Sequence, residues 1–217
     1  MSYIYTTFRE AHETGNPVMR PIFWEFPKEE THFAEQNQWM LGANFLACSM
    51  PNQGQMSVEV SLPTGNWYRF PFEVQNFNKL DAFTPFIAGK HTIHSDMNTG
   101  IPVFLRGGTI TLTKERARRN SVLQIHDPYT MYIAVDASGK AKGHAYDDDG
   151  RTFEGEWVKT AFVYDNGVLG SEIVSSGVDA GFKLIIERII LLKPNGKHVL
   201  VKKPDNLTTG AKWIFKL

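Results

Sequence analysis

The polar and apolar positions of the first 26 residues form two patterns. Between Tyr3 and Glu13 they suit a helix, which Gly15 and Pro17 would end. The next run, VMRPIFWEF at 18–26, is mostly apolar. Apolar side chains on both faces predict a strand buried on both sides, as in a parallel sheet, although Pro21 is unfavourable in a regular central strand.

A second helix is predicted from His32 to Leu41, with Thr31 as its N-cap and Gly42 directly after its end. Helix, strand and helix in succession are typical of an α/β barrel or a doubly wound sheet. One strand does not make such a domain. The first 44 residues are therefore interpreted as the tail of something larger.

From Phe45 onward the pattern changes to short strands separated by Gly, Pro, Asn and Asp, which is typical of β-sandwiches. Residues 71–100 are irregular and are interpreted as a long loop or an insertion. The charged segment Lys114–Asn120 is the best boundary between two sandwiches, and its basic side chains are interpreted as solvated. The strands are predicted at 45–50, 56–62, 67–70, 102–107, 108–113, 129–135, 141–147, 158–165, 167–176, 182–192, 198–203 and 212–217.

Composition argues against two classes of partner. Lys and Arg number 23 and so do Asp and Glu, which makes the formal net charge zero. Such a chain has no field of one sign to attract nucleic acid or an anionic membrane. No apolar stretch reaches the roughly 18 residues that a membrane span needs, and the first residues lack the basic and apolar regions of a signal peptide.

Cys48 is the only cysteine, so no disulfide forms within the chain. It lies in the apolar run FLAC and is predicted to be a packed core residue rather than a nucleophile. Asn206–Leu207–Thr208 is a glycosylation sequon, a triplet that is also common by chance.

Three adjacent aspartates, Asp147, Asp148 and Asp149, run into Gly150. A calcium loop between helices is disfavoured because its first ligand would be Ala145 and its flanks are strands; a looser calcium site stays open. A catalytic pair is disfavoured because neighbours on a strand point to opposite faces, whereas a glycosidase needs carboxyls that flank the substrate. A tight turn is favoured, since Asp–Gly is a common hairpin turn.

The remaining candidates are weak. His91 and His94 fall in a predicted loop near Asp96, where a metal site is less favoured than an exposed polar loop. Trp67 and Tyr68 offer rings that can stack on a sugar, but aromatics in a sandwich are more often core. No nucleophile elbow, P-loop or dinucleotide fingerprint occurs. The sequence thus predicts no cofactor and no metal.

Six stretches in this order resemble a single family: GNPVMRPIFWEFP, QWMLGANFLA, LPTGNWY, IPVFLRGGTI, ERARRNS and YDDDGRTF. Over nearly the whole chain they resemble the C-terminal portion of glycoside hydrolase family 31, the α-glucosidase family. ERARRNS and DPYT are similar in particular to the glucosidase II branch of that family.

The resemblance implies a mainly β fold: two consecutive antiparallel β-sandwich domains preceded by the last strand and helices of a (β/α)8 barrel. Residues 1–44 would be the barrel end, with 18–26 as its eighth strand and His32–Leu41 part of its closing helix. Residues 45–117 would form the proximal sandwich and 118–217 the distal one. The aspartate turn would then lie in the distal sandwich, far from an active site.

The same resemblance implies a function for a longer parent. A complete barrel takes about 250 residues, and in the family the two catalytic aspartates lie on earlier strands. No catalytic, cofactor-binding or metal-binding residue is therefore assigned to this chain. The parent would be a retaining α-glucosidase that removes terminal α-linked glucose from oligosaccharides or N-glycans. This chain would close and support the barrel, and alone it would be inactive.

Two alternatives stay open: a non-catalytic carbohydrate- or subunit-binding module, and a catalytically dead relative. The resemblance also implies an α-glucoside or glycan substrate held by the missing barrel, a non-catalytic β subunit as a possible partner, and the lumen of the endoplasmic reticulum. Asn37 and Ala43 stand where the family usually has aspartates, at the join of barrel and sandwich. Their loss is expected to alter how these domains pack.

Overall fold

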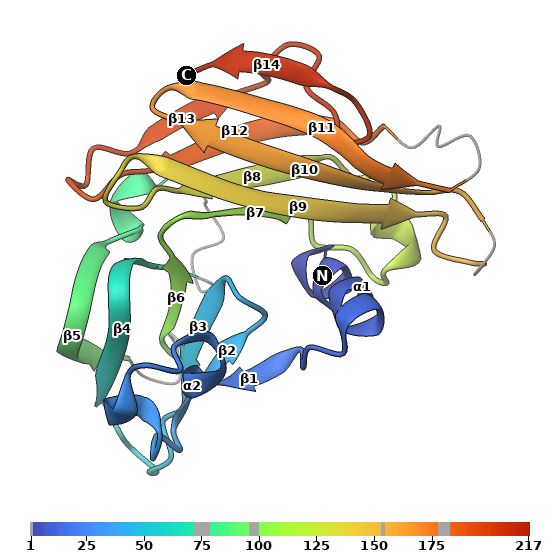
Figure 1. The fold of residues 1–217 in the computed structure, drawn as a ribbon. Coiled ribbons are helices and arrows are strands. Elements are labelled where there is room, and N and C mark those ends of the chain that lie inside the picture. The colour runs from blue at the N-terminus through green and yellow to red at the C-terminus, as the bar shows by residue number, and fades with distance from the viewer. Residues whose placement is uncertain (1, 72–78, 96–99, 153–154, 178–182) are drawn as a thin grey trace.

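The chain folds into two β-sheets with one helix in the angle between them (Figure 1). The structure, a computed structural model, describes residues 2–71, 79–95, 100–152, 155–177 and 183–217. None of the helices in these ranges is long and apolar enough to cross a membrane. The early elements are α1 (Ser2–Thr14), β1 (Met19–Pro21), α2 (Ile22–Glu25), η1 (Glu30–His32), β2 (Gln38–Leu41), β3 (Phe45–Cys48), β4 (Ser57–Arg69), η2 (Leu80–Ala82), β5 (Pro85–His94) and β6 (Val103–Arg106).

The later elements are β7 (Thr109–Thr113), η3 (Val122–Gln124), β8 (Tyr129–Ala134), β9 (Lys140–Asp148), β10 (Trp157–Asp165), β11 (Val168–Ser176), β12 (Ile186–Leu192), β13 (Val199–Lys202) and β14 (Trp213–Lys216). The first sheet has six strands in the order β1-β2-β3-β6-β4-β5, and all of its pairs are antiparallel. The second has eight, in the order β13-β12-β8-β7-β9-β10-β11-β14. The mainly β fold that the sequence predicts is confirmed.

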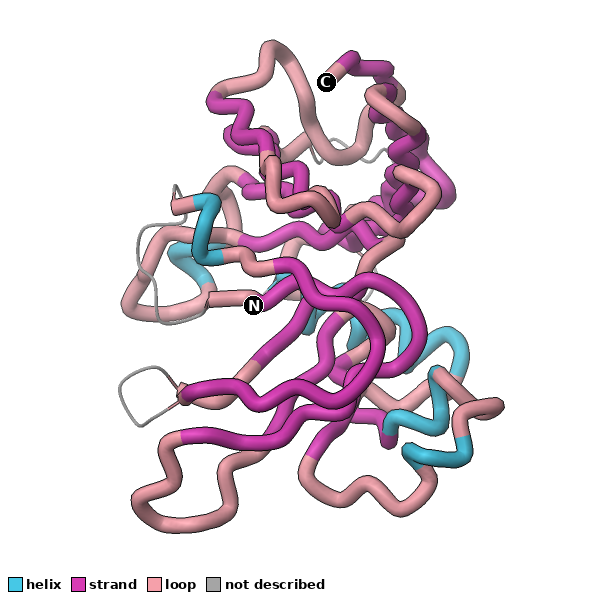
Figure 2. The backbone as a smooth tube through the Cα atoms, turned by 90° about the vertical axis from the view of Figure 1, so that its left-hand side faces the viewer, coloured by secondary structure: helices cyan, strands magenta, loops and turns pink. Residues whose placement is uncertain are grey.

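The eight-stranded sheet bends over on itself, in the upper part of the side view (Figure 2). Its core joins side chains from both halves, such as Met131 and Ile189 on one side and Phe162 and Leu169 on the other. Because the halves cover each other's apolar face, one sheet makes the two layers of a sandwich. Two pairs depart from the antiparallel expectation, since β8 runs parallel to β12 and β7 runs parallel to β9.

An aromatic core joins the two sheets. Tyr68, Phe70 and Phe83 of the first sheet region pack with Tyr132 of the second, and the rings of Phe70 and Tyr132 meet edge to face with centroids 5.0 Å apart. The Tyr68 hydroxyl donates to the Val135 carbonyl at 2.8 Å. Buried aromatic pairs of this kind add to the gain from burial alone, so the sheets form a common packed unit.

Helix α1 contacts both sheets. The Tyr3 hydroxyl donates to the Leu41 carbonyl at 2.9 Å beside the first sheet, whereas the Thr6 hydroxyl accepts from the Tyr146 amide of the second at 3.2 Å. Gly42 allows the first contact, because its φ of +57° suits glycine and a Cβ there would overlap the Tyr3 hydroxyl. The buried Arg20 binds Glu10 of α1 at 3.0 Å.

The prediction of a barrel strand at 18–26 is wrong. Only Met19–Pro21 is extended, and it pairs antiparallel with β2 at the edge of the first sheet. Pro21 has no N–H to extend the ladder, and the chain then makes the helical turn α2. This turn buries Ile22 and leaves Phe23 outside.

The helix predicted over His32–Leu41 is also wrong. A 3₁₀ turn ends at His32, and Gln38–Leu41 is a strand whose side chains are alternately buried and half-buried. The alternation that marks this strand extends over only four residues, which is too short to distinguish it from a helix in the sequence. The Asn37 carbonyl accepts from the Ser49 amide at 2.7 Å.

Two predictions between 56 and 100 need correction. The strands predicted at 56–62 and 67–70 are one strand, β4, whose pairing with β5 shifts register between Leu62 and Asn66. The region predicted to be a loop or insertion contains β5. Within it, 72–78 and 96–99 lie outside the described residues. The other predicted strands match β3 and β6 to β14 in place.

The chain passes from the first sheet to the second at Gly107–Gly108, because β6 pairs with β3 and β4 whereas β7 pairs with β8. A Cβ on Gly107 would overlap backbone oxygens on both sides of this crossing. The predicted boundary at Lys114–Asn120 thus lies after the first strand of the second sheet. Whether 1–44, 45–117 and 118–217 behave as domains stays a prediction.

His198 gives the inter-sheet contact a dependence on pH. Its Nδ1 accepts from the Lys193 amide at 3.0 Å and its Nε2 donates to the Phe83 carbonyl at 2.6 Å, so the ring is bound as neutral imidazole. Burial lowers the pKa of His198 below its ordinary value. Below about pH 6.5 the unfolded chain therefore takes up a proton that the folded chain does not, and the free energy of unfolding falls.

We expect His198→Gln to weaken the loss of stability between pH 7.5 and pH 5.5 in urea unfolding. His126→Gln, at an exposed position, is the control and should keep the wild-type pH dependence. An unchanged pH dependence in the His198 variant would contradict this assignment.

Candidate functional site

The three adjacent aspartates occupy three different environments. Asp149 shapes the turn after β9, because its carboxylate accepts from the Arg151 and Thr152 amides, each at 3.0 Å. Asp148 accepts from the Gly150 amide at 2.9 Å, and Gly150 has a φ of +64°. The favoured interpretation as a tight turn is therefore confirmed for these two residues.

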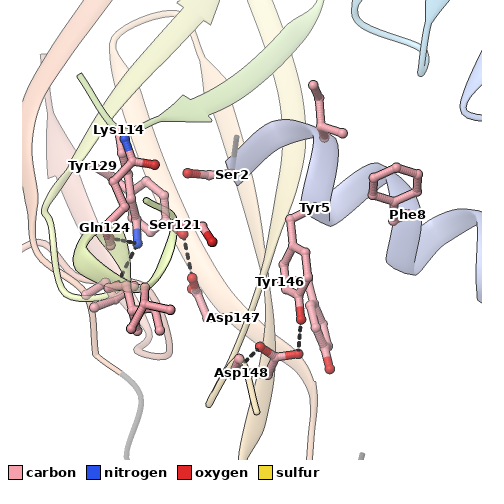
Figure 3. Close-up of a pocket in the computed structure, with 15 residues that line it drawn as sticks. Ser2, Tyr5, Phe8, Lys114, Ser121, Gln124, Tyr129, Tyr146, Asp147 and Asp148 are labelled. Atoms are coloured by element: carbon pink, nitrogen blue, oxygen red, sulfur yellow. Dashed lines mark hydrogen bonds between the residues drawn. The ribbon is translucent and has the colours of Figure 1, made fainter. Parts of the chain in front are cut away.

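Asp147 is different, because it points into the protein and is 5% exposed. Its Oδ1 accepts from the Tyr129 hydroxyl at 2.5 Å (Figure 3). Its Oδ2 has no hydrogen-bond partner among the described residues, although the Thr209 hydroxyl is near enough to lower the pKa. Burial outweighs that effect and raises the pKa of Asp147. The sequence did not predict this buried carboxylate.

Lys114 provides the nearest positive charge. Its Nζ donates to the carbonyls of Gln124 at 3.0 Å and Ile125 at 2.7 Å, and lies 4.8 Å from the centroid of the Tyr129 ring. Burial lowers the pKa of Lys114. The predicted solvated role of the basic run is wrong for this residue, whose charge fastens the η3 segment to the sheet.

A cavity of about 360 Å³ lies beside Asp147. Helix α1 supplies Tyr5 and Phe8 to its wall (Figure 3). The η3 segment supplies Val122 and Ile125. The Tyr5 hydroxyl donates to Asp148 Oδ2 at 2.6 Å, which holds the helix against the turn. The cavity is thus mainly apolar, with two carboxylates on one side.

Sequence reasoning missed this cavity because its walls come from distant parts of the chain. The only signal in the sequence was the pair of aromatic residues Tyr5 and Phe8 in the predicted helix, which the structure leaves partly exposed. Aromatic rings that a helix leaves exposed often mark a site of contact with a ligand or partner.

The other predicted candidates are placed as follows. Trp67 and Tyr68 are fully buried, which confirms their interpretation as core and removes them as a sugar platform. Cys48 is also fully buried, and burial raises the pKa of its thiol to about 11, as expected for a packed residue. His91 and His94 lie on β5 and not in the predicted loop; Asp96 is outside the described residues.

No group of three or more metal-binding side chains occurs within the described ranges. The carboxylates at the turn are largely engaged with backbone amides and tyrosine hydroxyls. The carboxylates of this turn therefore act as hydrogen-bond acceptors.

Comparison with known proteins agrees with the fold. Residues 15–111 match the glycosyl hydrolase family 31 C-terminal domain. A probable glucan 1,3-alpha-glucosidase of Arabidopsis thaliana is 34% identical over 197 residues, which cover 88% of this chain and 20% of that protein. Glucosidase 2 subunit alpha of Saccharomyces cerevisiae is 33% identical over 214 residues, with 92% and 22% covered.

The chain is similar to the C-terminal portion of glycosyl hydrolase family 31. The crystal structure of a glucosidase II alpha subunit with Tris bound is similar to it, with a TM-score of 0.75, 26% identity, and coverage of 88% of this chain and 21% of that one. The predicted resemblance to the C-terminal portion of family 31, and to glucosidase II in particular, is confirmed. The chain spans about a fifth of the length of these relatives.

The Tyr129–Asp147 hydrogen bond is expected to stabilise the second sheet, because it joins β8 and β9. Tyr129→Phe leaves a buried carboxylate oxygen without its donor, so we expect a loss of about 1–3 kcal/mol in the free energy of unfolding. The matched control, Tyr5→Phe, removes the same hydroxyl from a more exposed tyrosine–aspartate bond and should cost less than about 0.5 kcal/mol. Urea unfolding measures both, and equal losses would be evidence against a buried pair.

Proposed function

We propose that this chain is the C-terminal β region of a family 31 α-glucosidase, and that it closes and supports a catalytic barrel formed by the rest of that protein. The parent hydrolyses terminal α-linked glucose from oligosaccharides or N-glycans. It does so by the retaining mechanism, in which one carboxylate attacks the anomeric carbon and another serves as acid and then base. Neither carboxylate is assigned to this chain.

The observation that carries the proposal is an exposed apolar surface near the start of the chain, here called the aromatic surface. It consists of Met19, Phe23, Trp24 and Phe33, whose side chains are 61%, 41%, 48% and 52% exposed. The rings of Phe23 and Phe33 meet edge to face at 6.1 Å. Clustered large apolar side chains on a soluble surface are typical of an interface.

The length of the relatives supports the same partner. The chain accounts for only 20% and 22% of the two glucosidases compared above. A (β/α)8 barrel of about 250 residues fits readily within the remainder. The aromatic surface lies on β1, α2 and the residue after η1, which directly follow α1 in the chain. A domain that precedes α1 is therefore well placed to cover it.

The substrate, partner and compartment follow as further parts of the proposal. The substrate is an α-glucoside or a glycan with terminal α-linked glucose, and it binds in the barrel. A solved heterodimeric complex of ER glucosidase II, containing the catalytic subunit and the binding domain of a regulatory subunit, has a fold match with a TM-score of 0.76. We include a non-catalytic subunit partner and the lumen of the endoplasmic reticulum on this basis.

A substitution on the aromatic surface distinguishes an interface from a merely exposed ring. Phe23→Ser in the isolated 217-residue chain should lower the free energy of unfolding by only about 1 kcal/mol, since the side chain is 41% exposed and its main contact is the Phe33 ring. In the complete protein we expect a loss of about 1.5–3 kcal/mol, because the ring is then buried against the barrel.

Ile87→Ser is the control, at a side chain that is 70% exposed on β5, the opposite edge of the same sheet. It should have a small effect in both proteins. Chemical unfolding of the four variants measures this, and a small effect of Phe23→Ser in the complete protein would overturn the proposed interface.

A further inference from the structure

The cavity beside Asp147 has the features of a ligand site that lies apart from the aromatic surface. Its volume of about 360 Å³ is within the usual range for small-molecule sites, about 300–1,000 Å³. Such sites combine apolar walls with a few convergent polar groups. Here the apolar part is contributed by Phe8, Val122 and Ile125, and the polar part by Asp147 and Asp148.

The carboxylates of Asp147 and Asp148 can accept hydrogen bonds from a ligand. Asp147 is buried, and its Oδ2 has no hydrogen-bond partner in the described part of the chain. Asp148 accepts one hydrogen bond at each oxygen, from Tyr5 and from the Gly150 amide. Since each carboxylate oxygen has two lone pairs, both residues retain acceptor capacity. A ligand with hydroxyl groups would use it.

The charge around the cavity argues against ionic ligands. Two carboxylates repel an anion. A cation would meet the Lys114 ammonium group, which is held near Asp147 by the carbonyls of Gln124 and Ile125. A neutral ligand rich in hydroxyls avoids both penalties.

The aromatic side chains of Tyr5 and Phe8 offer a surface for a sugar ring. Tyr5 and Phe8 line the cavity and remain 46% and 58% exposed, so their rings are available to a ligand. The face of a pyranose ring presents C–H groups that pack on aromatic rings, while its edge presents hydroxyls. We propose that this cavity binds a single hexopyranose residue, with its face on Tyr5 and Phe8 and its hydroxyls toward Asp147 and Asp148.

This is a non-catalytic sugar site on the second sheet. The choice of a glucose-type sugar rests on the proposed function, whereas the class of neutral polyol rests on the cavity itself. The site holds one sugar residue of a glycan while the barrel acts on another residue of the same glycan. This raises the local concentration of the glycan at the barrel.

The test is a titration of the 217-residue chain with methyl α-D-glucopyranoside, followed by saturation-transfer NMR and calorimetry. We expect a dissociation constant in the millimolar range, as for a ligand of about a dozen heavy atoms. Tyr5→Ala should weaken binding about tenfold, which is about 1.4 kcal/mol. Tyr5→Phe retains the ring and should stay within about twofold.

Phe23→Ala is the matched control, since Phe23 is a similarly exposed ring that does not line the cavity. It should bind like the wild type, and circular dichroism verifies that each variant is folded. No saturable binding, or equal weakening by Tyr5→Ala and Phe23→Ala, would overturn the sugar site. Preferential binding of tetramethylammonium would overturn it in favour of a cation site.

The measurement separates the two proposals. It uses the isolated chain and needs no hydrolysis, so its failure leaves the role as a barrel support untouched. Conversely, sugar binding by a chain whose aromatic surface fails its own test would support a binding module without the barrel partnership.

Discussion

The aromatic core between the sheets is the constraint on which the rest of the structure depends. Tyr68, Phe70, Phe83 and Tyr132 are buried where the sheets meet, and they hold the sheets at one relative position. Helix α1 spans the angle that results, with contacts to both sides. If the sheets moved apart, α1 would lose one set of contacts, and the cavity between α1 and β9 would lose a wall.

This arrangement separates support from recognition. Buried apolar side chains within and between the sheets stabilise them, and the aromatic surface faces outward from β1 and α2. The aspartate turn serves both purposes. Asp149 fixes the backbone after β9, whereas Asp147 is buried beneath the cavity at a cost that Tyr129 offsets in part. Adjacent identical residues thus differ in role because strand geometry sends them to different faces.

Much of the fold could be predicted from short apolar runs and the turn residues that separate them. Strands such as Tyr129–Ala134 and Trp157–Asp165 have the composition and turn punctuation that identify them locally. The segment 18–41 could not be predicted in this way, because its elements are short. Three extended residues before one helical turn at Ile22–Glu25 have too little periodicity to separate strand from helix.

The cavity was beyond sequence reasoning for another reason. The Tyr5–Asp148 contact joins residues that are 143 positions apart in the chain, and no local pattern records it. The buried state of Asp147 likewise depends on Tyr129 and Lys114, which reach it through sheet pairing. By contrast, the family resemblance was available from six short motifs, because homologous chains retain order even where the local pattern is ambiguous.

The most direct test of the account is hydrolysis of p-nitrophenyl α-D-glucopyranoside by the protein translated from the complete reading frame, compared with the 217-residue chain. We expect the complete protein to cleave it with retention of the α configuration and the 217-residue chain not to cleave it. Hydrolysis by the isolated chain would contradict this expectation. So would a complete protein that binds α-glucosides but does not cleave them, which would instead identify a catalytically dead relative.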